Sequence, residues 1–251
     1  MDFIAVIPAR FGSSRFPGKP LADIHGKPMI QHATERAREA GAGRVIVATD
    51  DDRIANVAAG FVDVCMTSPD HQSGTERIAQ VLADQNIDDE QIVVNVQGDE
   101  PFVPPENIRQ VAQALNDRQD IAMATLATQI QSVADVTNPN VVKVVLNKNN
   151  EALYFSRSSI PFERERMVAH PTDADPQHYH RHIGLYAYRA RYVRQYVNYT
   201  PSVLEQLESL EQLRALWYGD KIYCALAAKA PPMGVDTPDD LAHLLAVMAD
   251  R

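Results

Sequence analysis

Residues 3–20 read FIAVIPARFGSSRFPGKP, an apolar run followed at once by a polar loop. The run from Phe3 to Pro8 is typical of a buried strand. The loop carries two glycines, two serines and three cations, namely Gly12, Gly18, Ser13, Ser14, Arg10, Arg15 and Lys19. Glycine lets backbone N–H groups approach a ligand, hydroxyls donate hydrogen bonds and the cations supply countercharge. We therefore predict that this loop wraps a chain of phosphates at the carboxyl end of the first strand.

The spacing of this loop differs from that of two well-known phosphate loops. Gly12 and Gly18 are separated by five residues, and Pro20 stands where a Walker loop needs Ser or Thr. No G-x-G-x-x-G occurs in the chain either. The pattern indicates a nucleotide loop of another type. The alternative is an ordinary strand-to-helix connection with solvated cations.

Composition limits the class of protein. The chain has 251 residues, of which 45% are hydrophobic, and a formal charge of −9. Its length suits one large core, or one core with a modest subdomain. The negative charge argues against a nucleic-acid binder, because affinity for a phosphate backbone needs positive surface. No apolar run approaches the roughly 18 residues of a membrane span, and no signal-like segment opens the chain, so we expect a cytoplasmic protein without membrane insertion.

The two cysteines, Cys65 and Cys224, lie in apolar surroundings without metal-ligand spacing. We interpret both as reduced core residues.

Short β-branched runs alternate with helical patterns through the first two-thirds of the chain. This order predicts an α/β fold with a mostly parallel sheet and helices on both faces. The predicted strands are 4–7, 44–48, 62–66, 92–96, 121–126, 141–146, 183–188 and 222–226, and the helices between them are 29–40, 53–59, 75–85 and 105–118. Ligands of such sheets bind beyond the carboxyl ends of the strands.

The later part of the chain follows a different pattern. A turn-rich tetrapeptide, Asn147–Asn150, suggests a hairpin within 141–156. The charged segment 163–177 is expected to be an exposed, mobile loop. A helix is predicted from about Ser202 to Trp217, with a leucine at every third position suited to a core or a subunit contact. A terminal helix should begin at Thr237 and Pro238.

Two aspartates are candidate Mg²⁺ ligands. Asp99 follows the strand 92–96 and a glycine, and Asp236 follows Gly234 far along the chain. Mg²⁺ takes oxygen ligands and keeps several waters, so one or two carboxylates plus substrate phosphates suffice. The alternative roles are a turn acid for Asp99 and a helix-entry residue for Asp236.

Two further polar clusters follow strands. The acids 50–52 are interpreted as a helix cap with acids in the first turn, rather than as a second metal site. Capping likewise explains Ser73 and Glu76, but it leaves Arg77 free for a nucleobase or a phosphate. Among the histidines 178, 180 and 182, structural zinc is disfavoured because no fourth ligand is evident. His182 is the one we expect to meet a substrate.

Seven stretches of the chain together closely resemble the 3-deoxy-manno-octulosonate (Kdo) cytidylyltransferases, also called CMP-Kdo synthetases. They are residues 7–21, 66–77, 96–101, 154–157, 182–186, 210–214 and 234–238. The first is shared in looser form with other sugar nucleotidyltransferases, including CMP-sialate synthetases. The stretches 66–77 and 182–186 point to the Kdo enzymes. The resemblance spans nearly the whole chain.

The resemblance implies a single Rossmann-like nucleotidyltransferase domain over 1–251, in which about 141–220 form an acceptor-binding and dimerisation subdomain. It implies transfer of the cytidylyl group of CTP to the anomeric hydroxyl of Kdo for lipopolysaccharide biosynthesis, with Mg²⁺ as cofactor, by a homodimer. Catalytic residues would be Arg10, Lys19, Asp99 and Asp236, the last two binding the metal. The nucleotide would be held by Pro8, Arg10, Ser13, Ser14, Lys19, Ser73, Gly74, Arg77 and Gln97. The acceptor would be held by Gln97, Arg157, His182, Tyr186 and Glu211.

Two rival interpretations remain open at this stage. One is a cytidylyltransferase for sialate or an amino-substituted Kdo, since acceptor pockets differ by a few polar contacts. The other is a catalytically idle nucleotide-binding regulator, whose sign would be loss of Lys19, Asp99 or Asp236. All three residues are present.

Overall fold

The computed structural model describes residues 1–12, 15–232 and 234–249. Seven strands form the main path of the sheet in the order β5-β4-β1-β6-β10-β7-β11. Six of them run in one direction and β10 runs against its neighbours β6 and β7. Their bounds are β1 (Phe3–Ala9), β4 (Arg44–Thr49), β5 (Asp63–Met66), β6 (Ile92–Asn95), β7 (Met123–Gln129), β10 (His180–Arg189) and β11 (Ile222–Leu226). The predicted mostly parallel sheet is confirmed.

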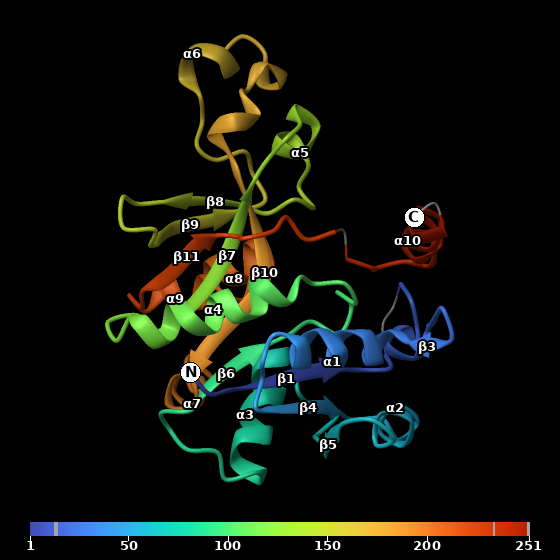
Figure 1. Cartoon of the computed structure of the whole chain (residues 1–251). Coiled ribbons are helices and arrows are strands. Elements are labelled where there is room, and N and C mark those ends of the chain that lie inside the picture. Colours follow the sequence, from blue (N-terminus) through green and yellow to red (C-terminus); the bar gives the residue numbers. More distant parts are fainter. Residues whose placement is uncertain (13–14, 233, 250–251) are drawn as a thin grey trace.

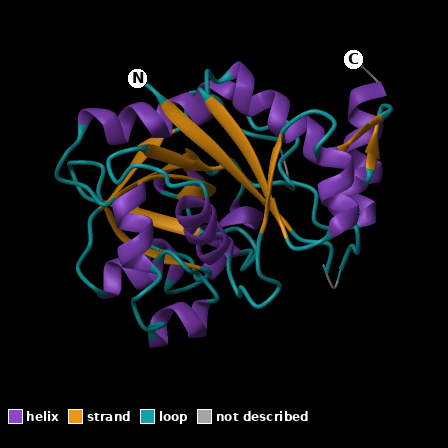
Figure 2. Ribbon diagram, turned by 90° about the horizontal axis from the view of Figure 1, so that it is seen from below, coloured by secondary structure: helices purple, strands orange, loops and turns teal. Residues whose placement is uncertain are grey.

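Helices cover both faces of this sheet (Figure 2). Side chains of β1 alternate between the two layers, because successive residues of a strand point to opposite faces. Phe3, Ala5 and Ile7 belong to one buried cluster, and Ile4 and Val6 to the other. The first layer holds α1 (Met29–Glu39), α2 (Asp52–Ala58) and α4 (Pro105–Asp117), and the second holds α3 (Gly74–Asp84), α7 (Ala190–Tyr196) and α9 (Leu213–Trp217).

A small hairpin and the last helix form a separate apolar cluster beside the sheet. The hairpin consists of β2 (Asp23–Ile24) and β3 (Lys27–Pro28), and α10 is Pro238–Ala249. Ile24 and Met29 are buried there together with Val235, and Leu241 packs against them. The segment before α10 is thereby held close to the loop that follows β1 (Figure 1).

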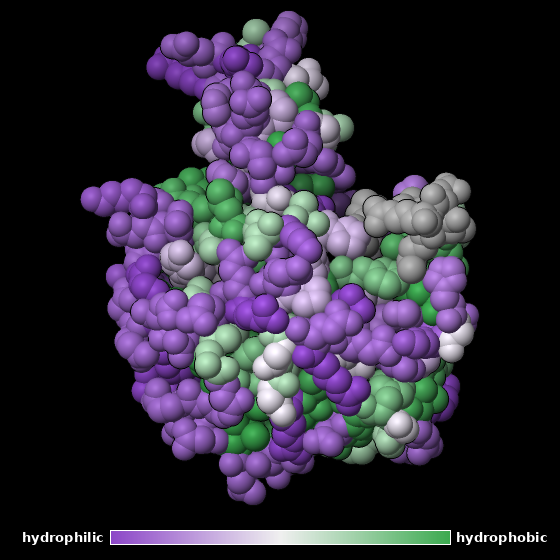
Figure 3. All heavy atoms as spheres, in the orientation of Figure 1, coloured by the Kyte–Doolittle hydropathy of each residue, from purple (hydrophilic) through white to green (hydrophobic). Residues whose placement is uncertain are grey.

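Residues 130–142 and 157–179 form a lobe, which we call the arm, that projects away from the sheet (Figures 1 and 3). It contains α5 (Val133–Thr137), α6 (Arg164–Met167) and the short 3₁₀ turns Pro171–Asp173 and Pro176–His178. The prediction that 163–177 is exposed is confirmed for most of its residues, but the segment is not a simple loop, because it contains short helical turns. Met167 and Ala174 are buried in a cluster with Ile130, Val136 and Tyr179. Their partners are distant in sequence, so local composition could not reveal this core.

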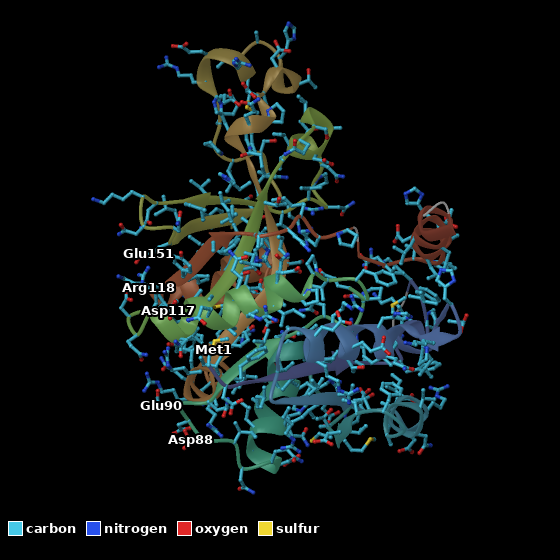
Figure 4. The ribbon with its side chains drawn as sticks, viewed as in Figure 1. Met1, Asp88, Glu90, Asp117, Arg118 and Glu151 are labelled. Carbon is cyan, nitrogen blue, oxygen red and sulfur yellow. The ribbon has the colours of Figure 1, made fainter. Side chains whose placement is uncertain are left out.

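The predicted hairpin within 141–156 is confirmed by β8 (Lys143–Leu146) and β9 (Ala152–Ser156). The Asn147 side-chain oxygen accepts hydrogen bonds from the N–H groups of Asn149 and Glu151, which closes the turn. An ion pair of 3.2 Å between Arg118 and Glu151 ties this turn to the loop that follows α4 (Figure 4).

The single helix predicted from about Ser202 to Trp217 is wrong. Two short helices occur instead, α8 (Val203–Glu208) and α9, separated where Ser209 adopts a left-handed backbone with φ 51°. A capping box at Ser202 starts α8 strongly, but the left-handed residue ends it after six residues. The leucines therefore do not share one face: Leu210 and Leu213 are buried, whereas Leu207 is 77% exposed.

Candidate active site

The loops at the carboxyl ends of β1, β5 and β6 enclose a first cavity of about 310 Å³. This is the edge at which parallel α/β sheets bind ligands. The cavity is lined by Pro8, Ala9, Arg10, Arg15, Lys19, Pro20, His71, Gln72, Ser73, Gly74, Arg77, Gln97, Gly98, Asp99 and Asp236. Every residue predicted to bind the nucleotide lies here except Ser13 and Ser14, which fall outside the described residues.

The loop after β1 is closed by its backbone. The N–H of Gly18 donates to the carbonyl of Phe11 at 3.0 Å. Gly18 has φ 72°, and a Cβ there would lie 3.0 Å from the Phe11 ring, so this closure requires glycine. Arg10 and Arg15 remain exposed at the cavity, whereas the Lys19 side chain is only 13% exposed. The loop thus presents three cations to one small space, as expected for a phosphate site.

Asp99 and Asp236 converge on the ammonium group of Lys19. Its Nζ lies 2.7 Å from an Asp99 oxygen and 3.3 Å from an Asp236 oxygen, and Arg15 pairs with Asp236 at 3.2 Å. The N–H of Val235 donates to the Asp99 carbonyl at 2.9 Å, which joins the two segments. Residues 137 positions apart therefore face one point, as the sequence predicted.

These two carboxylates fit the donor set that Mg²⁺ prefers. Both already reach one cation, the Lys19 ammonium, so a divalent ion between them would find two hard oxygen ligands. Across the described ranges no cluster of three His, Cys, Asp or Glu side chains could hold a metal by itself. Substrate phosphates and water would have to complete the coordination, and the metal role of Asp99 and Asp236 stays a prediction.

Glu100 is a third acidic residue beside this carboxylate pair. Burial, together with the neighbouring charge of Asp99, raises its pKa to about 7. Near neutral pH this carboxyl is therefore partly protonated.

The predicted cap of α3 is confirmed, since the Ser73 hydroxyl accepts from the N–H of Glu76 at 3.2 Å. Arg77, however, is not free. Its guanidinium pairs with Asp50 at 3.0 Å and also donates to the Thr67 hydroxyl. The interpretation of 50–52 as a cap with an acid in the first turn is confirmed, since Asp51 is the N-cap of α2 and Asp52 lies in its first turn. Asp50 precedes the cap and has a further role, because it pairs with the site residue Arg77.

A second cavity of about 230 Å³ adjoins the first, and Gly74 and Gln97 line both. The Gln97 amide donates to the carbonyl of Gly184 at 3.2 Å, where the register of β10 shifts. The remaining lining residues come from β6, β7, β10 and the segments around α3, α7 and α9. They are Thr75, Asn95, Met123, Tyr186, Tyr188, Tyr196, Glu211 and Gln212.

Three buried polar atoms in this second cavity have no hydrogen-bond partner among the residues that the structure describes. They are Oδ1 of Asn95, Oε1 of Glu211 and Nε2 of Gln212. Burial raises the pKa of Glu211. Orphaned buried polar atoms are rare in proteins, and each calls for a partner or a role that the surrounding side chains do not supply. Two acceptors, a donor and tyrosine rings suit a small ligand rich in hydroxyl groups.

Of the five residues predicted to bind the acceptor, three line the second cavity and two, His182 and Arg157, do not. Gln97, Tyr186 and Glu211 line the second cavity. His182 lies beside Tyr186, with ring centroids 5.4 Å apart, but its Nε2 is 3.0 Å from the Thr125 hydroxyl. The Arg157 guanidinium instead donates to the backbone carbonyls of Pro139, Glu208 and Ser209.

Sequence reasoning missed several lining residues of the second cavity. Asn95 carried a usable signal, because a polar residue interrupts the apolar run 92–96 of a central strand. Gln212 adjoins the predicted Glu211. No such signal marked Thr75, Tyr188 and Tyr196, because the periodicity of helices and strands explains them equally well as core residues.

We expect His182 to make the protein sensitive to acid. Burial lowers its pKa from 6.5 to about 3, so below pH 6.5 the unfolded chain takes up a proton that the folded chain does not. This contribution to stability is complete above pH 6.5 and is lost as the pH falls toward 3. Between pH 7 and pH 5 the free energy of unfolding should therefore fall by about 2 kcal/mol less in His182→Asn than in the wild type.

Urea unfolding at the two pH values measures this difference. The exposed His170→Asn serves as the control for losing a histidine. An equal fall in the free energy of unfolding of His182→Asn and of the wild type would contradict the lowered pKa of His182.

A mostly parallel sheet with a cationic cavity, beside a second cavity that suits a ligand rich in hydroxyl groups, fits a nucleotidyltransferase. Residues 4–222 match the family described as cytidylyltransferase. The 3-deoxy-manno-octulosonate cytidylyltransferase of Alteromonas mediterranea is 67% identical over 245 residues, covering 98% of this chain and 99% of that protein. The protein of the same name from Aeromonas salmonicida is 55% identical, with both chains fully covered.

Solved structures agree with these relatives. The structure of CMP:2-keto-3-deoxy-manno-octonic acid synthetase complexed with CTP has a TM-score of 0.88 and 44% identity, covering 99% of this chain and 98% of that one. A 4-diphosphocytidyl-2C-methyl-D-erythritol synthase shares the fold, with a TM-score of 0.64 at 11% identity and 98% of each chain covered. This chain belongs to the family of 3-deoxy-manno-octulosonate cytidylyltransferases.

Proposed function

We propose that this protein transfers the cytidylyl group of CTP to the anomeric hydroxyl of Kdo, giving CMP-Kdo and pyrophosphate. The observation that carries the proposal is the pair of joined cavities. One gathers Arg10, Arg15 and Lys19 for a triphosphate, and the other is lined by residues whose buried polar atoms lack partners, which suits a sugar acid. The chain's relatives carry the name of this activity.

The arrangement suits an in-line displacement. The Kdo hydroxyl would attack the α-phosphorus from the second cavity while pyrophosphate leaves toward the loop after β1. Gln97 lines both cavities and lies at their junction, where it would orient the reacting groups. Lys19, Arg10 and Arg15 would stabilise the charge that develops on the leaving pyrophosphate. No covalent intermediate with the protein is needed.

Asp99 and Asp236 would hold Mg²⁺ together with the phosphates of CTP. When bound, the ion would neutralise phosphate charge and orient the triphosphate. The chain's own part is to fix both carboxylates through the Val235–Asp99 backbone hydrogen bond and the helix cap before α10. In that cap the Asp240 carboxylate accepts from the N–H groups of Asp236 and Thr237.

Incubation with CTP, Mg²⁺ and one acceptor at a time tests the activity. We expect rapid pyrophosphate release with Kdo and much slower release with sialate or an amino-substituted Kdo. A preference for either of these acids would replace the proposed acceptor. Tight CTP binding without turnover on any of the three would favour the idle regulator.

We also propose that the segment of about 141–220 acts as an acceptor-binding and dimerisation subdomain of a homodimer. Its acceptor role is supported by Tyr186 and Glu211, which it contributes to the second cavity. Val203 and Leu207 lie four residues apart on α8 and are 59% and 77% exposed, which suits a contact with a second copy. Sedimentation should find a dimer that Leu207→Lys weakens, and a monomeric wild type would contradict the proposal.

The product would serve lipopolysaccharide biosynthesis, and we place the reaction in the cytoplasm. In the described part of the chain, every helix is too short or too polar to span a bilayer. The negative charge of the chain likewise supports a small anionic substrate, held by a local cluster of cations, over a nucleic acid.

A further inference from the structure

Arg77 is the buried cation of the nucleotide cavity. It belongs to the first turn of α3, its residue is 4% exposed, and it lines the first cavity. Unlike the exposed Arg10 and Arg15, it is enclosed by protein on most sides. A buried guanidinium needs partners of opposite charge or carbonyl and hydroxyl acceptors.

Those partners come from the ends of two other strands. Asp50 follows β4 and accepts from Nη2 of Arg77 at 3.0 Å. Thr67 follows β5, and its hydroxyl accepts from Nη1, which also lies 3.5 Å from the Ser68 carbonyl. The N–H of Thr67 donates to the Thr49 carbonyl at 2.8 Å, so the two acceptors are linked through neighbouring backbone. The guanidinium plane is thereby fixed from two sides.

This arrangement leaves donors for a ligand. A guanidinium has five N–H groups in a planar fork, and the contacts with Asp50, Thr67 and Ser68 use three of them. An unrestrained arginine would lose its rotational freedom on binding, whereas a fixed one has already lost it. The carboxylate of Asp50 therefore prepares Arg77 for the nucleotide although Asp50 does not itself line the cavity.

We propose that Asp50 is a positioning residue for CTP, assisted by Thr67, and that it acts by holding the guanidinium of Arg77 toward the nucleotide cavity. The inference rests on the proposed function only in naming CTP as the nucleotide. It assigns Asp50 a role in ground-state binding of CTP, separate from the acceptor site. Replacing Asp50 should therefore change the affinity for CTP but not the affinity for the acceptor.

The experiment compares Asp50→Ala and Asp50→Asn with the wild type. Calorimetry without acceptor measures the Kd of CTP, and pyrophosphate release measures kcat and the KM of each substrate. We expect the Kd and KM of CTP to rise about tenfold, because a misplaced guanidinium binds weakly. The KM of Kdo and the kcat at saturating CTP should stay near the wild-type values. Asp50→Glu, which keeps the carboxylate, should recover part of the affinity.

The matched control is Asp63→Asn. Asp63 pairs with Arg44 at 2.8 Å on the surface of the neighbouring strands and lines neither site cavity. It should leave the Kd of CTP unchanged. If Asp50→Ala does not fold, Thr67→Val still removes one acceptor of Arg77 without leaving an unpaired charge, and it should raise the Kd of CTP in the same direction.

Two results would overturn the inference. One is an unchanged Kd of CTP in every Asp50 and Thr67 variant that folds. The other is a proportional change in the KM of CTP, the KM of Kdo and kcat, as a purely structural ion pair would give. Failure of the proposed function would look different, because the wild type itself would release no pyrophosphate with Kdo.

Discussion

Asp99→Asn should lower turnover by about a thousandfold, because a neutral amide neither balances Lys19 nor provides an anionic ligand for the phosphate-bound cation. The fold should survive. The Asp99 side chain is 35% exposed, and the contact that holds this segment to Val235 is made by its backbone carbonyl, which the substitution keeps. Pyrophosphate release with CTP and Kdo measures turnover, and thermal unfolding checks the fold.

Asp23→Asn is a suitable control for this variant. Asp23 is an exposed acid of the β2–β3 hairpin, and it does not line either site cavity. Its replacement should leave turnover at the wild-type rate. Near-normal turnover of Asp99→Asn would remove Asp99 from the reaction and with it the proposed metal site.

Lys19→Met should have two effects of opposite sign. Turnover should fall about a hundredfold, because a largely buried ammonium of the proposed phosphate site is lost. Divalent cations should bind more tightly in the absence of CTP, by about tenfold, because Asp99 and Asp236 then lack the charge that now lies 2.7 and 3.3 Å from their oxygens. In the wild type the ammonium would compete with a metal ion for the same two carboxylates.

Titration of the nucleotide-free protein with Mn²⁺, followed by electron paramagnetic resonance, measures the second effect. Lys27→Met is the matched control, since Lys27 pairs with Glu35 at 2.8 Å outside both cavities. It should leave Mn²⁺ affinity unchanged. Equal or weaker Mn²⁺ binding in Lys19→Met would show that the two carboxylates do not form a cation site.

Local sequence patterns predicted much of the fold. Alternating apolar runs and amphipathic segments identified the strands and the major helices, because burial on a sheet face or a helix face leaves a regular period. They also identified the loop after β1 and both aspartates, because glycines, cations and acids at strand ends carry chemical meaning on their own. The two short helices α8 and α9 were misjudged, since a single left-handed residue, Ser209, interrupts an otherwise helical leucine pattern.

Apart from the convergence of Asp99 and Asp236, contacts between distant residues followed from no local pattern. The pairing of Asp50 with Arg77, the core of the arm around Tyr179 and the orphaned polar atoms around Glu211 each join segments separated along the chain. Composition and periodicity indicate whether a residue is buried, but they do not indicate which distant residue it contacts. The order of the strands and the packing of helices over the sheet determine these contacts. In this protein they bring an acid beside a helix cap, Asp50, and tyrosines of the core to the cavities of the candidate site.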